Sequence, residues 1–344
     1  MRVLAGDIGG TKTAVAIVKF SARGLAFERL ERYPSADYAG LEPIVEEFLS
    51  SERVKPSVAA FGVAGPVRAG TAKVTKLPWR IEERRLARRI GIARVSLLND
   101  FVAAALGLLH LTPRQVCVLA PGRPDPLGPI GILGAGTGLG EAALLQIGGR
   151  YEVIPSEGGH ADFGPRNPIE DRLVVFLREK FGRASRDRIL SGGGLVLLYQ
   201  FLLSEGFARE NRFVRSAFER GDDGAAVVSR FGLSGKDRLC RKALEMFVSI
   251  YGSEAGNLAL QYRATGGVFV AGGIAAKILP AIRRPAFLRA FREKPPMEQL
   301  LAAIPVRVVR DPRLGLIGAA AGAYFTTIET TRPSRKTIVR PTRS

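Results

Sequence analysis

Two widely separated stretches of this chain repeat one pattern, in which an apolar strand runs into a glycine-rich turn and a second strand follows. In the first, Arg2 to Ile8 is expected to form a buried strand, Gly9-Gly10-Thr11 breaks it, and Thr13 to Phe20 resumes β character. In the second, the strand Ile130 to Leu133 runs into Gly134–Gly140, which holds four glycines in seven residues. Glycines let the backbone come close to a ligand, and the second stretch holds more of them than a turn needs.

The rest of the chain alternates apolar strands with stretches of helical spacing, which predicts an α/β fold. Further strands are expected over Ser57–Val63, Arg94–Leu98, Ala142–Ile147, Tyr151–Ile154, Val268–Ala271 and Pro305–Val309. Helices are expected over Leu41–Leu49, Ile81–Ile90, Phe101–Leu109, a segment from Pro168, Lys236–Tyr262 and Leu314–Phe325. Residues 326–344 lack apolar periodicity, so we expect a basic, flexible tail there.

Composition excludes several classes of protein. Of the 344 residues, 46% are hydrophobic, which is enough to bury a core, and the length suggests two lobes or one large domain. Cys117 and Cys240 are the only cysteines, which excludes a disulfide framework and a cysteine-based zinc site. The first apolar run is too short for a secretory signal and no run is long enough to span a membrane, so we expect a cytoplasmic protein.

The charge of the chain is strongly positive. Lys and Arg number 51 against 32 Asp and Glu, a formal net charge of +19, which raises nucleic acid or another acidic surface as a partner. The basic residues are mostly arginine in a chain rich in alanine and glycine, a mixture that genome composition alone can produce. The arginines of the expected helix Ile81–Ile90 are therefore interpreted as a solvated face, and a nucleic acid partner is not expected.

Three glycine turns are candidates for binding phosphate or nucleotide. In Asp7-Ile8-Gly9-Gly10-Thr11-Lys12, backbone N–H groups can bind phosphate and the carboxylate can hold Mg²⁺ through water, while a tight hairpin alone is the alternative. Gly136-Thr137-Gly138 can form a second cradle, or a glycine-rich bulge. Gly272-Gly273 stands at a helix start, where a nucleotide can approach closely. The chain has no GxxxxGK[ST] motif, which disfavours a Walker-type ATPase.

Asn99 and Asp100 follow a buried strand and precede a helix. A carboxylate at the carboxyl end of a strand can take the proton from a hydroxyl that attacks a phosphate. Asp100 suits that role. The alternative is that Asp100 only caps the helix that starts at Phe101.

Glu157, His160 and Asp162 lie within one short glycine-containing segment, Glu157–Phe163. One histidine and two carboxylates in such a loop are weak evidence for zinc. Short polar side chains that fork across neighbouring hydroxyls are typical of sugar binding, and Glu157 and His160 fit that need better.

The spread of these turns resembles the actin-like ATPase superfamily, in which two hairpins clamp the phosphates and a later glycine pair holds the adenosine. Within it, the chain resembles the bacterial glucokinase family over about residues 2–325. The cysteine-rich zinc signature of the other bacterial sugar-kinase family, the repressor, open reading frame, kinase group, is absent. The matching motifs occur in the family's order and are Asp7–Lys12, Gly62–Val67, Leu77-Pro78-Trp79, Leu98–Phe101, Gly134–Gly140, Glu157–Phe163, Leu190-Ser191-Gly192 and Gly266–Ile274.

The resemblance implies a two-lobed, ribonuclease H-like sugar kinase fold in which each lobe is a mixed sheet flanked by helices. Residues 1–110 and 305–325 would form the smaller lobe, 111–304 the larger lobe, and 326–344 the tail. The ligands would be glucose, ATP and Mg²⁺, the 6-hydroxyl of glucose would be phosphorylated, and the protein would be a homodimer. A kinase for mannose, fructose or glucosamine is one alternative, and a sugar-responsive, nucleic-acid-binding regulator is another.

The resemblance also carries roles onto individual residues. Asp100 would be the catalytic base, and Asp7 would position Mg²⁺. Glucose would be bound by Gly65, Pro66, Asn99, Asp100, Glu157, His160 and Asp187. ATP would be bound by Asp7, Gly9, Gly10, Thr11, Lys12, Gly136, Thr137, Gly138, Gly272 and Gly273. Asp187 stands where the family has a glutamate, and Lys12 and Lys76 stand where it often has asparagine.

Overall fold

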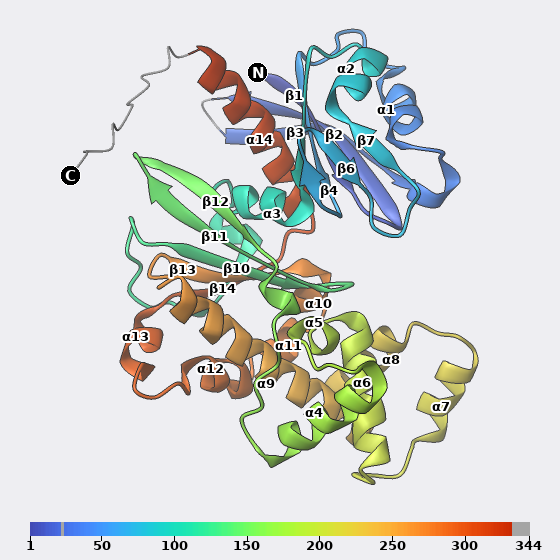
Figure 1. Ribbon diagram of the computed structural model, residues 1–344, viewed down its shortest axis with the longest axis vertical. Helices are drawn as coiled ribbons and strands as arrows, with labels where there is room; N and C mark the ends of the chain where they lie inside the picture. The colour runs from blue at the N-terminus through green and yellow to red at the C-terminus, as the bar shows by residue number, and fades with distance from the viewer. Residues whose placement is uncertain (22–23, 332–344) are drawn as a thin grey trace, which may run out of the picture. The chain divides into compact units, whose positions relative to one another are not determined.

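The computed structural model describes residues 1–21 and 24–331 and divides the chain into two units (Figure 1). One unit consists of Met1–His110 and the segment that begins at Arg313, and the other of Leu111–Pro312. Each unit is built around a mixed sheet flanked by helices, so the predicted α/β class is confirmed.

The first unit contains a five-stranded sheet made of β1 (Arg2–Ile8), β2 (Lys12–Ser21), β3 (Gly24–Pro34), β4 (Val58–Val63) and β8 (Arg94–Asn99). The strand order is β3-β2-β1-β4-β8. β1, β4 and β8 run parallel, whereas β2 is antiparallel to both β1 and β3. Its helices are α1 (Leu41–Leu49), α2 (Glu83–Ile90), α3 (Asp100–Leu108) and α14 (Leu314–Thr331), with a short 3₁₀ turn at Ser35–Asp37.

The strand β1 is apolar on both faces because helices cover both sides of its sheet. Successive side chains of a strand point to opposite faces. Val3 and Ala5 pack in a cluster with α14, whereas Leu4 and Ile8 pack in a second cluster with α1 and α2. The continuous apolar run in the sequence is therefore a strand buried between two helical layers.

Two parts of this unit differ from the sequence expectation. The helix expected from Ile81 begins at Glu83, because Ile81 pairs with Ala72 in a separate small sheet. The edge strand β3 has no counterpart among the expected elements, since many of its residues are charged and mask the alternation. The small sheet consists of β5 (Val67–Arg68), β6 (Thr71–Lys73) and β7 (Arg80–Glu82).

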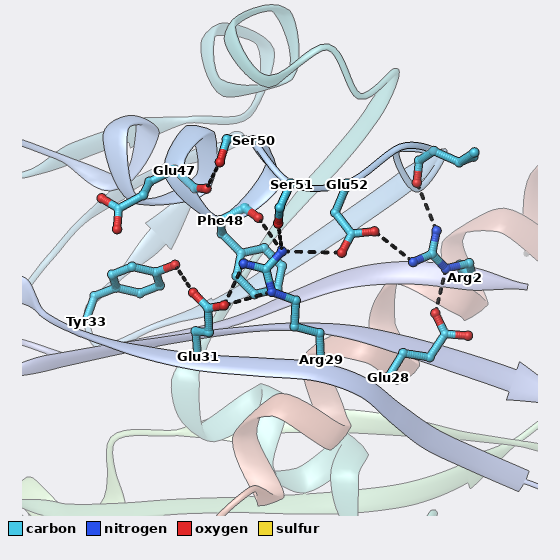
Figure 2. A network of polar contacts seen from close by, with 11 residues as sticks. Arg2, Glu28, Arg29, Glu31, Tyr33, Glu47, Phe48, Ser50, Ser51 and Glu52 are labelled. Atoms are coloured by element: carbon cyan, nitrogen blue, oxygen red, sulfur yellow. Dashed lines mark hydrogen bonds and ion pairs between the residues drawn. The ribbon is translucent and has the colours of Figure 1, made fainter.

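A network of ion pairs ties β3 to the end of α1 (Figure 2). Arg29 of β3 binds Glu31 through Nε and Nη2 at 2.8 and 2.6 Å, and its Nη1 donates to the Phe48 carbonyl at 2.9 Å. Glu52 accepts from Arg2 Nη2 at 2.9 Å and lies 3.4 Å from Arg29 Nη1. Two arginines therefore share one carboxylate, which holds the segment after α1 against the edge of the sheet (Figure 2).

The second unit contains a six-stranded sheet in the order β12-β11-β10-β13-β14-β9. Its strands are β9 (Val116–Ala120), β10 (Ile130–Ala135), β11 (Leu139–Ile147), β12 (Arg150–Ser156), β13 (Gly267–Ala271) and β14 (Val306–Val309). β10, β13 and β14 run parallel, and the other pairings are antiparallel. The expectation that residues 305–312 belong with the first segment is wrong, because β14 pairs with β13 on one side and β9 on the other.

Helices make up most of the remaining second unit. They are α4 (Pro168–Phe181), α5 (Arg186–Ile189), α6 (Gly192–Ser204), α7 (Arg212–Glu219), α8 (Gly224–Ser234), α9 (Arg238–Gln261), α10 (Gly272–Lys277), α11 (Leu279–Ile282), α12 (Pro285–Arg292) and α13 (Glu298–Ala303), with 3₁₀ turns at Pro113–Gln115 and Gly158–His160. The longest, α9, packs against β10 and β13 and also contacts α6, α8 and α12. Within the described part of the chain, no helix has both the length and the apolar character needed to cross a bilayer.

The last helix runs further than the sequence predicts. It was expected to end at Phe325 with a tail from Thr326, but α14 continues to Thr331. The first residue that breaks helices after it is Pro333, so no local signal stops the helix earlier. The rest of the predicted tail, residues 332–344, lies outside the described residues.

Candidate active site

Asp7 and Asp100 lie at the carboxyl ends of the parallel strands of the first sheet. Because β1, β4 and β8 are parallel, their carboxyl ends meet there, with Asp7 opposite Gly62 and Val63 opposite Asn99. Burial and the negative charge of Asp100 raise the pKa of Asp7 to about 6. The sheet therefore brings two carboxyl groups close enough to sense each other's charge.

Asn99, and not Asp100, is the residue that caps α3. Its Oδ1 accepts hydrogen bonds from the amides of Phe101 and Val102 at 2.9 and 3.2 Å, and its Nδ2 donates to the Gly65 carbonyl at 3.2 Å. Asp100 is the first residue of the helix, and its Oδ1 also accepts from the Phe101 amide at 2.9 Å. The capping alternative considered for Asp100 thus belongs to Asn99, which also joins Gly65 to this edge.

The first glycine turn is closed by its own backbone and by a serine from the next connection. The Gly9 amide donates to the Lys12 carbonyl at 3.1 Å, and Ser35 Oγ donates to the Gly9 carbonyl at 2.8 Å. The Ser35 amide donates to Thr11 at 3.0 Å. The Gly9 amide is therefore engaged within the turn itself, and Ser35 is a supporting residue that the sequence motif did not indicate.

Gly10 lies against the connection between β6 and β7 of the small sheet. Its neighbours are the Thr75 carbonyl and the side chain of Lys76. Lys76 and Thr75 also line a pocket of about 320 Å³ together with Pro66. An expected phosphate-binding glycine and an expected sugar-lining proline thus border one small region of the first unit.

The second glycine turn joins β10 to β11 and is tied to two other segments. The Gly136 amide closes the turn on the Gly138 carbonyl at 2.8 Å. The Gly192 amide, at the first residue of α6, donates to the Gly136 carbonyl at 2.9 Å. The amino end of α6, which favours negative charge, therefore lies beside this turn. Thr137 is exposed at its tip.

Asp187 of α5 lies against this turn. Its Oδ1 accepts from the Leu139 amide at 2.9 Å, and a Cβ placed on Gly138 would lie 2.4 Å from the same oxygen. Only glycine leaves room for such an approach. The residue expected to bind a sugar hydroxyl is thus also a structural tether of the second glycine turn.

Glu157 and His160 are exposed on one short 3₁₀ turn. His160 Nε2 lies 3.9 Å from Glu157 Oε2, and 64% and 90% of the two side chains, respectively, are accessible. Asp162 instead binds Arg183 at 2.8 Å. Among the described residues no group of three histidine, cysteine or acidic side chains is arranged to hold a metal ion. Two polar side chains that open to solvent side by side can bind neighbouring sugar hydroxyls.

The segment before and within α5 holds this turn in place. Arg183 Nη2 donates to the His160 carbonyl at 2.6 Å, the Arg186 amide donates to the Ala161 carbonyl at 3.1 Å, and Phe163 donates to Ala184 at 3.0 Å. Because α5 also carries Asp187, one segment contacts both the Glu157–His160 turn and the glycine turn.

The third glycine pair starts α10 and lies next to the end of β10. Gly272 has a positive φ of 87° and backs onto the Ala135 carbonyl. The buried Tyr251 of α9 connects the two segments, since its hydroxyl accepts from the Ala135 amide at 2.9 Å and donates to the Ala271 carbonyl at 3.3 Å. Tyr251 is a further supporting residue that no sequence motif indicated.

The structure thus places the expected site residues in two groups. The first unit holds Asp7, Gly9, Gly10, Thr11, Lys12, Gly65, Pro66, Asn99 and Asp100. The second unit holds Gly136, Thr137, Gly138, Glu157, His160, Asp187, Gly272 and Gly273.

Comparison with known proteins gives one consistent result. The glucokinase family model matches residues 4–325. A glucokinase of Nostoc punctiforme is 44% identical over 332 residues, which cover 92% of this chain and 97% of that protein. The crystal structure of a glucokinase from an Antarctic psychrotroph superimposes with a TM-score of 0.83 at 30% identity, covering 94% of this chain and 99% of that one.

A more distant structure shares the fold alone. A ROK-family glucokinase from Streptomyces griseus superimposes with a TM-score of 0.64 at 20% identity, covering 94% of this chain and all of that one. The similarity extends over both units of the chain, which agrees with the predicted actin-like ATPase fold of sugar kinases.

Proposed function

Because this chain belongs to the glucokinase family, we propose that it transfers the γ-phosphoryl group of ATP to the 6-hydroxyl of glucose and releases glucose 6-phosphate and ADP. The observation that supports this most directly is the pair of carboxyl groups, Asp7 and Asp100, at one edge of the first sheet. Phosphoryl transfer to a hydroxyl needs a group that accepts the proton and a cation that offsets the phosphate charge. In this proposal Asp100 accepts the proton and Asp7 holds the cation.

We assign the catalytic base to Asp100. As O6 of glucose forms its bond to the γ-phosphorus, Asp100 accepts the hydroxyl proton. The bond from the γ-phosphorus to the bridging oxygen breaks, and that oxygen leaves on ADP. The hydrogen bond from the Phe101 amide to Asp100 Oδ1 holds the carboxylate at the first residue of α3.

Asp7 and Asp100 fit the requirements of a magnesium ion. Burial and the negative charge of Asp100 disfavour ionisation of Asp7, and a cation near the two carboxyl groups removes the repulsion between them. Oxygen ligands are those that Mg²⁺ prefers, and one or two carboxylates suffice when nucleotide phosphates and water complete its coordination. We propose that Asp7 holds the ion, which when bound offsets the charge on the phosphates.

Residues of the second unit supply the remaining contacts of the proposal. Glu157, His160 and Asp187 join Asn99 in binding glucose hydroxyls, and Gly65 and Pro66 line the sugar. The turns around Gly10 and Thr137 and the amino end of α6 bind the phosphates. Gly272 and Gly273 approach the adenosine. The hydrogen bond between Asp187 and Leu139 supports a coupling of the proposed sugar-binding residues to the proposed phosphate-binding turn.

The nucleic-acid alternative has little support from the basic helix α2. Arg85 and Arg89 pair with Glu42 and Glu46 of α1, with distances of 3.4 and 2.5 Å. Arginines that are neutralised by neighbouring carboxylates offer less charge to a phosphate backbone. The charge of this helix therefore supports the solvated surface expected from the sequence, and the structure adds that two of its arginines form ion pairs.

We also propose that the protein is cytoplasmic, that it is a homodimer and that its two units are the two lobes of the kinase. Cys117 and Cys240 are both free thiols, which supports a reducing compartment. Analytical ultracentrifugation at micromolar concentration tests the dimer, and a single monomer mass would overturn it.

A coupled assay of ADP release, run with ATP and a panel of hexoses, tests the substrate. We expect the kcat/KM for glucose to exceed that for mannose, fructose and glucosamine by about tenfold or more, because a site that pairs each hydroxyl rejects sugars that leave one unpaired. Omission of Mg²⁺ should abolish turnover. A higher kcat/KM for another hexose would replace glucose as the substrate, and no ADP release with any hexose would refute the proposal.

A further inference from the structure

A buried carboxyl group lies directly beneath the turn that carries Glu157 and His160. Glu141 of β11 is 2% exposed, and its Oε2 lies beside Gly158 of the turn. A Cβ on Gly158 would be only 2.2 Å from that oxygen. The turn therefore rests on the Glu141 carboxyl group without an intervening side chain.

No residue in the described ranges 1–21 and 24–331 donates a hydrogen bond to either carboxyl oxygen of Glu141. The group that it faces is the carboxylate of Glu254, which is itself 4% exposed on α9. Each oxygen of Glu254 already accepts one hydrogen bond. Oε1 accepts from Arg186 Nη1 at 2.8 Å, and Oε2 accepts from Asn257 Nδ2 at 2.9 Å. A second buried carboxylate that faces Glu254 without a hydrogen-bond donor of its own is unfavourable when ionised, so the arrangement favours a proton on Glu141.

The other charged and titratable groups around this pair agree with that state. Burial and the negative charge of Glu254 raise the pKa of Glu141 to about 8, against the opposing effect of Arg186. Tyr251 of α9 also faces Glu141, and Lys294 lies near Glu254 through Ser253, whose hydroxyl it contacts at 3.0 Å. Burial and Arg166 lower the pKa of Lys294.

The same cluster holds the turn from its other side. The side chain of Arg186 binds Glu254, while its backbone amide binds the Ala161 carbonyl directly after the turn. Glu141, Glu254 and Arg186 thus form a buried support that contacts the turn at both ends, at Gly158 and at Ala161.

We propose that Glu141 is a positioning residue for the sugar. As a neutral carboxylic acid whose O–H donates a hydrogen bond to Glu254, it fixes the turn bearing Glu157 and His160, and loss of its proton to solvent loosens glucose binding. Ionised Glu141 would face Glu254 as a second negative charge, so the two groups would separate and carry Gly158 with them. This inference rests on the proposed assignment of Glu157 and His160 to glucose.

The test is the pH dependence of the two Michaelis constants in the intact enzyme, measured from about pH 6.5 to about pH 9.5. In the wild type, we expect the KM for glucose to rise about fivefold or more with a midpoint near 8, while the KM for ATP changes by less than about twofold. Glu141→Gln is isosteric and permanently neutral and can still donate to Glu254. It should keep the glucose KM within about twofold of wild type at pH 7 and remove the alkaline rise.

The matched control is Glu152→Gln, which removes an exposed carboxylate from the neighbouring strand β12 and should leave the alkaline rise intact. Glu254→Gln gives an independent check, because removing the neighbouring negative charge should move the midpoint to lower pH. An alkaline rise that persists in Glu141→Gln would overturn the inference. If that variant does not fold, an unmoved midpoint in Glu254→Gln would do the same.

The role of Glu141 and the glucose kinase activity can be tested separately. An enzyme that phosphorylates glucose and loses glucose affinity in His160→Ala, yet shows no effect of Glu141→Gln on its pH profile, refutes only the role of Glu141. A chain that releases no ADP with any hexose refutes the proposed function itself.

Discussion

The carboxylate of Asp187 accepts a hydrogen bond from the backbone amide of Leu139 at 2.9 Å. This contact joins a residue that we propose binds glucose to the turn that we propose binds phosphate. The aspartate is one methylene shorter than the family's glutamate, and it lies close against Gly138. Its short side chain is therefore matched to the glycine turn.

Removing this contact should affect both substrates. We expect Asp187→Ala to raise the KM for glucose and the KM for ATP by about tenfold each, because an amide at the edge of the core loses its acceptor and the turn loses its anchor. Asp187→Asn keeps an acceptor oxygen and should spare the KM for ATP. Steady-state kinetics on the two variants measure the difference. Equal effects of Ala and Asn on ATP would show that the carboxylate charge, and not the tether, matters.

Replacing the proposed base should remove turnover but not binding. Asp100→Asn is expected to lower kcat by about 10²–10⁴-fold while the protein remains folded, because the amide cannot accept the proton of the attacking hydroxyl. Glucose should raise the melting temperatures of both the variant and the wild type. Asp37→Asn, an exposed aspartate of the same unit, is the control. A kcat near the wild-type value would remove Asp100 from the mechanism.

The shared carboxylate of Glu52 should contribute measurably to stability. Glu52→Gln weakens the ion pairs to both Arg2 and Arg29, and we expect it to lower the free energy of unfolding by about 1 kcal/mol. Glu28→Gln weakens a single pair to Arg2 and should cost less. Denaturant titration of both variants at low and high salt gives the comparison. The difference should shrink as salt screens the pairs, and a Glu52 variant as stable as wild type would show that the network is energetically neutral.

Protonation of Glu141 should also appear in the stability of the protein. The pKa of this group rises from 4.5 to about 8 on folding, so between these values the folded state keeps a proton that the unfolded chain has lost. Stability from this group is therefore fully present below about pH 4.5 and is lost as the pH rises to about 8. We expect the melting temperature of Glu141→Gln, relative to wild type, to increase by about 3 °C or more from pH 5 to pH 8.

Calorimetry or fluorescence at matched ionic strength measures that change. Glu152→Gln should follow the wild type at every pH. If the difference in melting temperature between Glu141→Gln and wild type stays constant from pH 5 to pH 8, Glu141 ionises as easily in the folded protein as in the unfolded chain. That result would refute the proposal that Glu141 keeps its proton when buried.

Much of the fold could be predicted because its signals are local. The helix α1 has the bounds expected from its apolar spacing, and β1 and β4 follow continuous apolar runs. The elements that escaped prediction lack such a signal. β3 is charged along its exposed face, and the residue at the start of the expected second helix, Ile81, forms a strand because of its partner Ala72.

The candidate site divides in the same way. Asp7, Asn99 and Asp100 could be identified because each stands at the end of a strand or directly after one. Which of two adjacent residues caps α3 could not be read from residue type, since asparagine and aspartate are both good caps. The backbone geometry decides it in favour of Asn99.

By itself, the sequence determined the α/β alternation, the glycine turns and the residue types that phosphoryl transfer to a sugar needs, because these depend on neighbours along the chain. Only the tertiary structure decided that Asp187 tethers the glycine turn, that Tyr251 joins two turns and that Glu141 faces Glu254. Those relationships join segments that are distant in sequence. Burial, which changes what a carboxyl group can do, exists only once such segments pack together.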